Sequence, residues 1–398
     1  MTPKEAAARA IRERSARLVD LSHRIHETPE IGFEEFVSSR LVADELSHEG
    51  FGVTMGVCDL PTAFDARSRG AGGLAVGLCA EYDSLPGIGH ACGHNIIAAA
   101  AVGAAIGLAA VADDLDVTVR VLGTPAEEVG NASGKVLMLE RGAFDGLHLA
   151  MMVHPAPLDV LMPRLIAAAT FDVHYTGVAS HASAFPERGV NAADALTVAQ
   201  TAIGLLRQHL PEGDRVHGIV TYGGEAPNIV PARTSARYTV RSASLEQLEH
   251  LRERVIRCFE AGAQATGASL GIEGGDLPYA EVVHDAELAA AYRSNAEALG
   301  RQFVDRGPMV ERSAASTDMG NVSRRMASIH PLIGIDSLPA VNHQPEFADC
   351  CVRPAADRAV VDGAIALAWT AIDAATSGSL RPRLLAGSQP FSDAPPST

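Results

Sequence analysis

The sequence of 398 residues is long enough for two domains, and a hydrophobic content of 47% with 20% charged residues is typical of a globular protein. This composition excludes disordered and fibrous classes. A formal net charge of −16 argues against a nucleic-acid or anionic-membrane surface, because both need clustered Lys and Arg. Six cysteines without framework spacing favour a reducing compartment. The first 18 residues lack the apolar stretch of a secretory signal, so we expect a cytoplasmic protein.

One apolar run, from Ile96 to Ala112, is close to the shortest length that spans a membrane. It consists mainly of alanine and glycine, and Asp113 and Asp114 end it. We therefore predict a helix buried inside a large domain and no membrane partner.

Regular elements are predicted along the first half of the chain. Apolar residues at helical spacing indicate an amphipathic helix over residues 5–26 and a second over 34–49. The stretches 74–82, 117–122 and 147–153 are apolar enough for buried strands, and helical stretches separate them. This order predicts an α/β fold, a mainly parallel open sheet with helices on both faces.

Ionisable side chains follow the ends of these strands. They are Asp83, Cys92, His94, Glu127, Glu128 and His154. Ligands bind beyond the carboxyl ends of the strands in such sheets, so we expect these groups to share one crevice. Crowded carboxylates repel one another unless a cation compensates them, and a metal, with two ions favoured over one, is the simplest compensation.

The segment GHACGHN (89–95) fits that interpretation. A thiolate and an imidazole are ligands that Zn²⁺ prefers, and glycines beside Cys92 and His94 allow a tight turn. Taken alone, the segment is equally consistent with a buried cysteine and histidines that cap the next helix.

The pattern changes after residue 164. Residues 171–177 alternate as a half-exposed antiparallel strand does, and a helix (191–210), two strands (215–222 and 234–242) and a helix opened by Ser244 follow. The chain then returns to helix-forming residues, a strand-like stretch at 327–333 and a helix at 356–374. We predict a discontinuous catalytic domain (1–164 and 276–377), an inserted α+β domain (165–275) and a flexible tail (378–398).

Ordered motifs carry a family resemblance. GIGHACGHN, GTPAEE, the His154-Pro155 pair, GVASHASAFPERGVNAADA and APNIVP occur in this order. The chain resembles the aminoacylase and carboxypeptidase metallopeptidases (peptidase family M20). It is most similar to the branch with indole-acetyl-amino-acid hydrolases, aminobenzoyl-glutamate hydrolase and a β-alanyl-lysine-type dipeptidase. The resemblance covers nearly the whole chain up to about residue 375.

The resemblance implies a zinc-exopeptidase-like catalytic domain and a ligand set for two divalent ions per subunit, zinc first, with manganese or cobalt as alternatives. The implied ligands are Cys92 as the bridging thiolate, His94, Glu128, His154 and His343. Glu127 matches the catalytic base. His181 matches a lid-domain histidine that reaches an active site, often in the neighbouring subunit, and Asn228 lies in the matching substrate loop. The inserted domain forms the dimer contact in relatives, so we expect a homodimer.

The resulting hypothesis is a metal-dependent amidohydrolase that cleaves N-acyl amino acids or dipeptides with metal-activated water. The general-base role suits Glu127, because a carboxylate in reach of water takes its proton and later hands it to the leaving amine. His181 would bind substrate or stabilise the oxyanion. The alternatives are a dipeptidase, an aminobenzoyl-glutamate-type hydrolase, or a metal- or peptide-binding module without catalysis.

Several residues stay open at this stage. Asp83 is expected to orient a neighbouring ligand. Glu81 stands where relatives outside the branch have a histidine ligand, and it is not assigned as a ligand. Asp318 and His90 are undecided between the site and the scaffold, whereas His148 and His330 are expected to lie idle.

Overall fold

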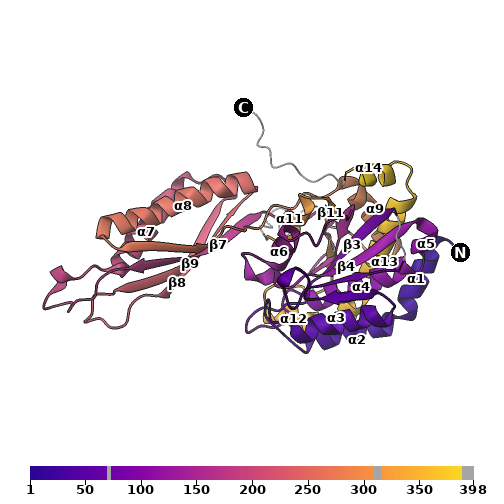
Figure 1. Cartoon of the computed structure of the whole chain (residues 1–398), viewed down its shortest axis with the longest axis horizontal. Coiled ribbons are helices and arrows are strands. Elements are labelled where there is room, and N and C mark those ends of the chain that lie inside the picture. Colours follow the sequence, from indigo (N-terminus) through magenta and orange to yellow (C-terminus); the bar gives the residue numbers. More distant parts are fainter. Residues whose placement is uncertain (70–72, 306, 308–309, 311–314, 388–398) are drawn as a thin grey trace.

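The computed structural model describes residues 1–69, 73–305, 307, 310 and 315–387, and it has two lobes (Figure 1). The larger lobe combines the N-terminal and C-terminal parts of the chain. The smaller lobe is formed by the middle of the sequence.

A six-stranded sheet lies at the centre of the larger lobe, in the order β1-β2-β4-β3-β5-β11. Its strands are β1 (Gly52–Met55), β2 (Phe64–Arg67), β3 (Leu74–Ala80), β4 (Val117–Gly123), β5 (Leu149–Met151) and β11 (Ala327–Ile329). The strands from β4 to β11 run parallel, as predicted, but β1 and β2 form an antiparallel edge. The sequence analysis missed β1 and β2 because each has only four residues, too few for a periodic pattern.

Helices cover both faces of this sheet. They are α1 (Pro3–Glu13), α2 (Ser15–His26), α3 (Phe36–His48), α4 (His94–Ala109), α5 (Ala112–Leu115), α6 (Gly134–Glu140), α9 (Ala286–Ala298), α11 (Met319–Ser323), α12 (Pro345–Cys350), α13 (Pro354–Thr376) and α14 (Leu380–Ala386). The main core contains α4, α13 and α2, whereas α6 and α11 pack against the opposite face. The predicted α/β architecture is confirmed.

The buried helix α4 explains the apolar run. Nearly all of its residues are buried, because the sheet, α13, α1 and α2 surround it. Small residues permit this close packing: a Cβ on Gly103 would lie 2.7 Å from the Cβ of Ala364 in α13. Within the described chain, α13 is long and apolar enough to cross a membrane, but most of it is buried in the core.

Three boundaries differ from the predictions. The helix expected over residues 5–26 is two helices, because the backbone leaves helical geometry at Arg14. The stretch 327–333 is also divided, into β11 and β12 (Leu332–Gly334), and β12 pairs with β6 (His154–Ala156). The tail is helical over α14, where Leu380 and Leu384 are buried, so that part of the flexible-tail prediction is wrong; residues 388–398 lie outside the described chain.

The smaller lobe is an antiparallel sheet covered by two helices on one face (Figure 1). The strand order is β10-β7-β9-β8, with β7 (Ala167–Thr176), β8 (Arg215–Tyr222), β9 (Arg233–Ser242) and β10 (Ser269–Gly274). The helices are α7 (Ala192–Leu206) and α8 (Leu245–Thr266), and Ser244 caps α8 through the Gln247 N–H. This lobe has a hydrophobic core of its own, as expected of an inserted α+β unit.

Candidate metal centre and active site

The expected side chains meet at the carboxyl edge of the parallel strands. Glu81 and Asp83 follow β3, Glu127 and Glu128 follow β4, and His154 follows β5. Cys92 and His94 lie at the start of α4, where Gly93 adopts a φ of +78°. A side chain at Gly93 would also collide with Pro155, because a Cβ there would lie 2.4 Å from its ring. Glycine therefore allows the cysteine loop to pack against the histidine strand.

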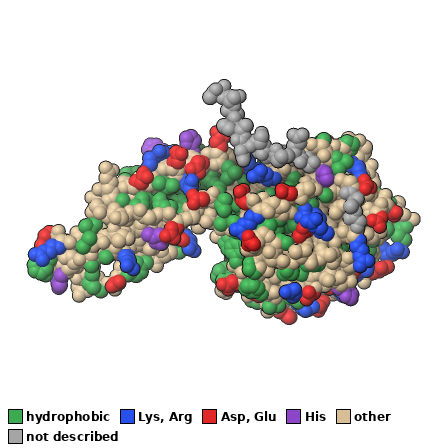
Figure 2. All heavy atoms as spheres, viewed as in Figure 1, with side chains coloured by type: hydrophobic (Ala, Val, Ile, Leu, Met, Phe, Trp, Pro, Cys, Tyr) green, Lys and Arg blue, Asp and Glu red, His purple; other side chains and the backbone are tan. Residues whose placement is uncertain are grey.

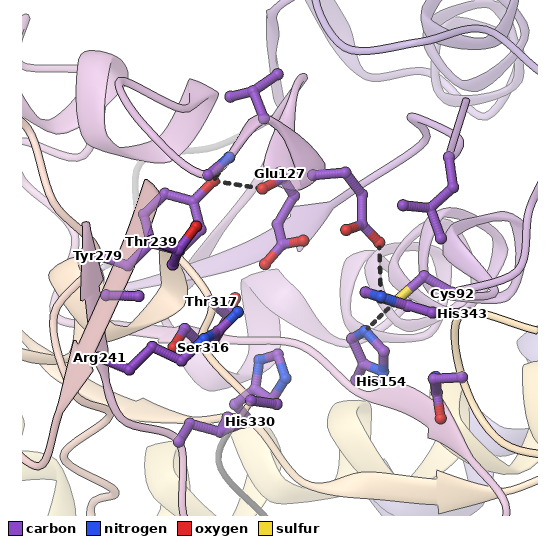
Figure 3. Close-up of a pocket in the computed structure, with 18 of the residues that line it drawn as sticks. Cys92, Glu127, His154, Thr239, Arg241, Tyr279, Ser316, Thr317, His330 and His343 are labelled. Atoms are coloured by element: carbon purple, nitrogen blue, oxygen red, sulfur yellow. Dashed lines mark hydrogen bonds and ion pairs between the residues drawn. The ribbon is translucent and has the colours of Figure 1, made fainter. Parts of the chain in front are cut away.

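Donor atoms gather in three groups whose members lie within 4.8 Å of one another. The groups are Cys92, His94 and His154; Cys92, Glu128 and His343; and His94, Glu127 and Glu128. Cys92 Sγ lies 3.3 Å from His154 Nε2, and His343 Nε2 lies 3.4 Å from Glu128 Oε1 (Figure 3). Because two of the groups share the thiol, the arrangement fits two ions bridged by Cys92.

Unpaired buried atoms support the same fit. His94 Nε2 and Glu128 Oε1 are buried and have no hydrogen-bond partner among the described residues, although Glu81 Oε2 and His343 Nε2, respectively, lie 3.4 Å from them. Atoms of this kind are costly unless a ligand or an ion satisfies them. A thiol, imidazoles and a carboxylate form a donor set that suits zinc and similar ions.

Hydrogen bonds fix the orientation of these donors. Asp83 accepts through Oδ1 from His94 Nδ1 at 2.9 Å and through Oδ2 from the Glu128 backbone N–H at 2.9 Å. His154 Nδ1 lies 2.9 Å from the carbonyl oxygen of Pro155. In each case the bonded Nδ1 leaves Nε2 directed at the cluster. Asp83 therefore lies where an orienting residue would.

Glu127, which belongs to the third donor group, projects into the cavity (Figure 3). Its turn is held by Ala126, which has a φ of +58° and donates its N–H to Glu35 Oε1 at 2.7 Å. The Tyr279 hydroxyl donates to the carbonyl oxygen of Glu127. Burial, with the neighbouring Glu128 charge, raises the pKa of Glu127 well above its ordinary value. For Glu128, burial acts in the same direction, but His343 and His94 outweigh it and lower the pKa.

The cavity has a volume of about 570 Å³ and lies where the two lobes meet. The smaller lobe contributes Arg237, Thr239 and Arg241, which alternate along β9 and so share a face of its sheet. The Arg241 guanidinium donates to Ser316 Oγ at 2.7 Å, across the cavity from the donor groups (Figure 3). The sequence analysis missed Arg241, although the alternation of polar residues along the predicted strand was a usable signal.

Comparisons with known proteins agree with this geometry. Residues 167–266 match the family model of the peptidase dimerisation domain of M20 peptidases. The chain is 38% identical to the Xaa-Arg dipeptidase of Mus musculus, over 96% of this chain and 90% of that protein. It is also 34% identical to one component of the p-aminobenzoyl-glutamate hydrolase of Escherichia coli, over 65% and 57% of the respective chains.

The chain belongs to the M20 peptidase family. Its fold is also that of a dinuclear metal-binding M20 peptidase from Bacillus subtilis, with a TM-score of 0.66 at 21% identity over 91% of this chain and 99% of that one. Membership makes this protein a metal-dependent hydrolase of peptide or amide bonds. The family predicted from the ordered motifs is confirmed.

Two predicted site residues of this M20 member lie outside the cavity. His181 and Asn228 are exposed side by side in the smaller lobe, where the Ala182 N–H donates to the Asn228 carbonyl at 3.0 Å. His181 Nδ1 accepts from the Ala184 N–H at 3.1 Å. Neither residue lines the cavity of its own chain.

The residues left open separate clearly. Asp318 and Glu81 are fully buried and both pair with Lys135, and Glu81 Oε2 lies 3.4 Å from His94 Nε2 of the donor groups. His90 is buried against His26 and does not line the cavity. His330, expected to lie idle, is buried and lines the cavity with its ring 5.4 Å from that of His154. Its position follows from β11 and β12, whose pairing could not be read from the sequence.

Proposed function

We propose that this M20 member hydrolyses dipeptides or N-acyl amino acids at a centre of two divalent ions. Cys92 would bridge the ions, and His94, His154, Glu128 and His343 would complete the set. The observation that carries the proposal is the pair of donor groups that share Cys92, with the Glu127 carboxylate directed into the same cavity. Zinc is the first expectation, because a thiolate with imidazoles suits a borderline-soft ion, and manganese or cobalt are alternatives.

The chemistry divides between the ions and the side chains. Bound ions would polarise the scissile carbonyl and lower the pKa of water towards neutrality. Glu127, whose carboxylate is directed into the cavity, would take the proton of the attacking water and deliver it to the leaving amine. Arg241, on the opposite side of the cavity, is the guanidinium that we assign to the carboxylate of the substrate.

A dipeptide is the substrate class that we favour. The relative named Xaa-Arg dipeptidase matches over nearly the full length of both chains, whereas the aminobenzoyl-glutamate hydrolase component matches over little more than half of its own length. N-acyl amino acids are the second candidate, because an acylated α-amino acid presents the same amide and carboxylate.

We also propose a homodimer that forms through the smaller lobe. Strand β8 is a sheet edge with exposed apolar side chains at Ile219, Val220 and Tyr222, and such an edge is suited to pairing with a second chain. The matched dimerisation-domain model covers this strand. In the dimer, His181 and Asn228 would enter the partner's cavity and contact substrate there.

The domain division and location are part of the proposal. Residues 1–164 and 276–377 would act as the catalytic domain and 165–275 as the lid and dimer domain. A cytoplasmic location follows from the composition and cysteine usage alone.

The test is metal reconstitution followed by a substrate panel. Elemental analysis should find about two divalent ions per chain. Metal-loaded protein should hydrolyse members of a panel of dipeptides with basic, acidic or neutral C-terminal residues, N-acyl amino acids and aminobenzoyl-glutamate. Full activity in exhaustively metal-free protein would contradict the proposed centre, and cleavage of aminobenzoyl-glutamate alone would replace the proposed substrate class.

A further inference from the structure

Lys135 is a buried lysine next to the proposed metal centre. The chain has only two lysines, and the side chain of this one is fully buried at the start of α6. Its Nζ lies 2.6 Å from Glu81 Oε1 and 2.6 Å from Asp318 Oδ1. A buried ammonium is costly unless it is paired in this way, so three chain segments are joined by one cation.

Asp318 holds the lysine from one side. Its Oδ2 accepts from Ser133 Oγ at 2.7 Å and from the Lys135 backbone N–H at 3.0 Å, while Oδ1 accepts from Nζ at 2.6 Å. Gly134 makes this geometry possible, because a Cβ there would lie 1.9 Å from the Pro125 carbonyl oxygen. The ammonium is therefore fixed beside the turn that carries Glu127.

Glu81 lies on the opposite side of Lys135 from Asp318, between the lysine and the donor groups. Its Oε2 lies 3.4 Å from His94 Nε2, the nitrogen that Asp83 leaves available for an ion. Among the described residues, however, Glu81 joins none of the three donor groups. A carboxylate this close to a ligand nitrogen could itself bind the ion. The other oxygen of Glu81, Oε1, forms an ion pair with Lys135.

We propose that Lys135 is a positioning residue that holds Glu81 beside His94 but out of the ligand set, and so keeps a coordination position free for water and substrate. Catalytic metal sites differ from structural ones in this open position. Without the ammonium, Glu81 would lose its partner and turn to the nearest cation, the ion. The inference rests on the proposed metal centre.

A purely structural role for Lys135 predicts something different. If the lysine only joined α6 to Asp318, its loss would lower stability and metal affinity together and would leave the coordination of retained ions unchanged. The two roles therefore separate in the spectrum of the bound metal.

The experiment uses cobalt-loaded full-length protein, because the visible absorption of Co²⁺ weakens as its coordination number rises. Lys135→Met should bind Co²⁺ no more weakly than wild type in calorimetry, show weaker absorption, and lose about 10–100-fold in kcat. Lys4→Met is the matched control, because Lys4 lies on α1 in an ion pair with Asp373, and it should match wild type. Melting temperatures of all variants separate loss of fold from loss of function.

Two further variants keep the proposal testable if Lys135→Met does not fold. Glu81→Gln should retain about two ions and the wild-type spectrum, because Glu81 is not a ligand; loss of an ion overturns the proposal. Lys135→Met/Glu81→Gln should regain the wild-type spectrum and part of the lost turnover, and a failure of this rescue also overturns it. If the wild-type protein binds no ions or hydrolyses no amide, the proposed function is refuted. If the wild-type protein is active with two ions but Lys135→Met has an unchanged spectrum, only the role of Lys135 is refuted.

Discussion

The carboxyl edge of the central sheet and the outer loops of the smaller lobe carry residues of the same kinds in opposite environments. At the sheet edge, His94 is fully buried and Asp83 fixes its ring. In the smaller lobe, His181 and Asn228 are exposed, and the hydrogen bonds of the His181 ring go to its own loop. Figure 2 shows a notch between the narrow smaller lobe and the broad larger lobe.

This difference shows which part of the site one chain completes by itself. Burial at the sheet edge fixes most of the donors before any ion or substrate arrives, which is the preorganisation that catalysis needs, whereas the His343 side chain is 55% exposed. The exposed pair has no such support and would gain it only from a partner. We therefore expect each substitution at the sheet edge to reduce activity by itself. The exposed pair should lose its role in catalysis when the dimer dissociates.

The largest effect is expected from the adjacent carboxylates of the sheet edge. Glu127→Gln should keep the fold and the ions but lose about 10⁴-fold or more in kcat, because one group serves as base and then as acid. Glu128→Gln should weaken metal binding and recover partly at high metal concentration. Calorimetric metal titration beside kcat decides this, and ion loss in Glu127→Gln with retention in Glu128→Gln would reverse the assignment.

The exposed pair is tested by His181→Ala. Turnover should fall by about 10²–10³-fold with unchanged ion content, because one transition-state contact is lost. Mixing this variant with Glu127→Gln, after dissociation and reassociation, should restore activity. Half of the random dimers are mixed and each has one intact site of two, so about a quarter of wild-type activity is expected. If the mixture is as inactive as its components, His181 acts in the active site of its own chain or has no role in the reaction.

The dimer edge gives the next effect. Ile219 is 66% exposed on β8, and Ile219→Asp would place a charge in the proposed interface. Sedimentation should show a shift to monomer, and kcat should fall in parallel because the His181 loop leaves the partner's cavity. Val283→Asp is a control at a 52% exposed valine of the larger lobe and should leave the dimer intact. A fully active Ile219→Asp monomer would remove the need for a partner.

The smallest effect concerns the support of the catalytic turn. Burial, with the Asp83 charge, raises the pKa of Glu35 from 4.5 to about 7. The folded state therefore holds this proton more tightly than the unfolded state does. The contribution of Glu35 to the free energy of unfolding is complete below pH 4.5 and is lost as pH rises through 7. The loss should be roughly 3 kcal/mol.

Urea unfolding of chelator-treated protein at pH 5 and pH 8 measures this dependence. Glu35→Gln should remove most of the pH dependence of stability. Glu34→Gln, at the exposed residue next to Glu35, should keep the wild-type dependence. An unchanged slope in Glu35→Gln would show that other groups cause it.

Much of the larger lobe was predictable because its signals are local. Strand β3 is apolar on both faces, β4 is largely apolar and buried, and ionisable residues follow β3, β4 and β5, so the parallel alignment of these strands was enough to place Cys92, Glu128 and His154 at one edge of the sheet. The parts that were missed depend on pairing between distant segments. His330 reaches the cavity through β12, which pairs with β6, and Arg241 reaches it because the C-terminal end of β9 lies where the two lobes meet.

The buried charges could not be predicted for a different reason. Lysine is normally exposed, so nothing in the sequence marked Lys135 as buried, and Asp318 stayed undecided between the site and the scaffold. Only the fold shows that α6 and α11 pack together on one face of the sheet and bring the two side chains to 2.6 Å.

The scarcity of lysine has a practical consequence for attaching the protein to a support. Amine-reactive esters need an accessible, unprotonated amine, and Lys135 is fully buried in the interior. Lys4 is the other side-chain amine of the chain, 34% exposed on α1, on the side of the larger lobe away from the smaller one (Figure 1). Coupling through Lys4 should therefore give a uniformly oriented layer in which the cleft between the lobes faces the solution.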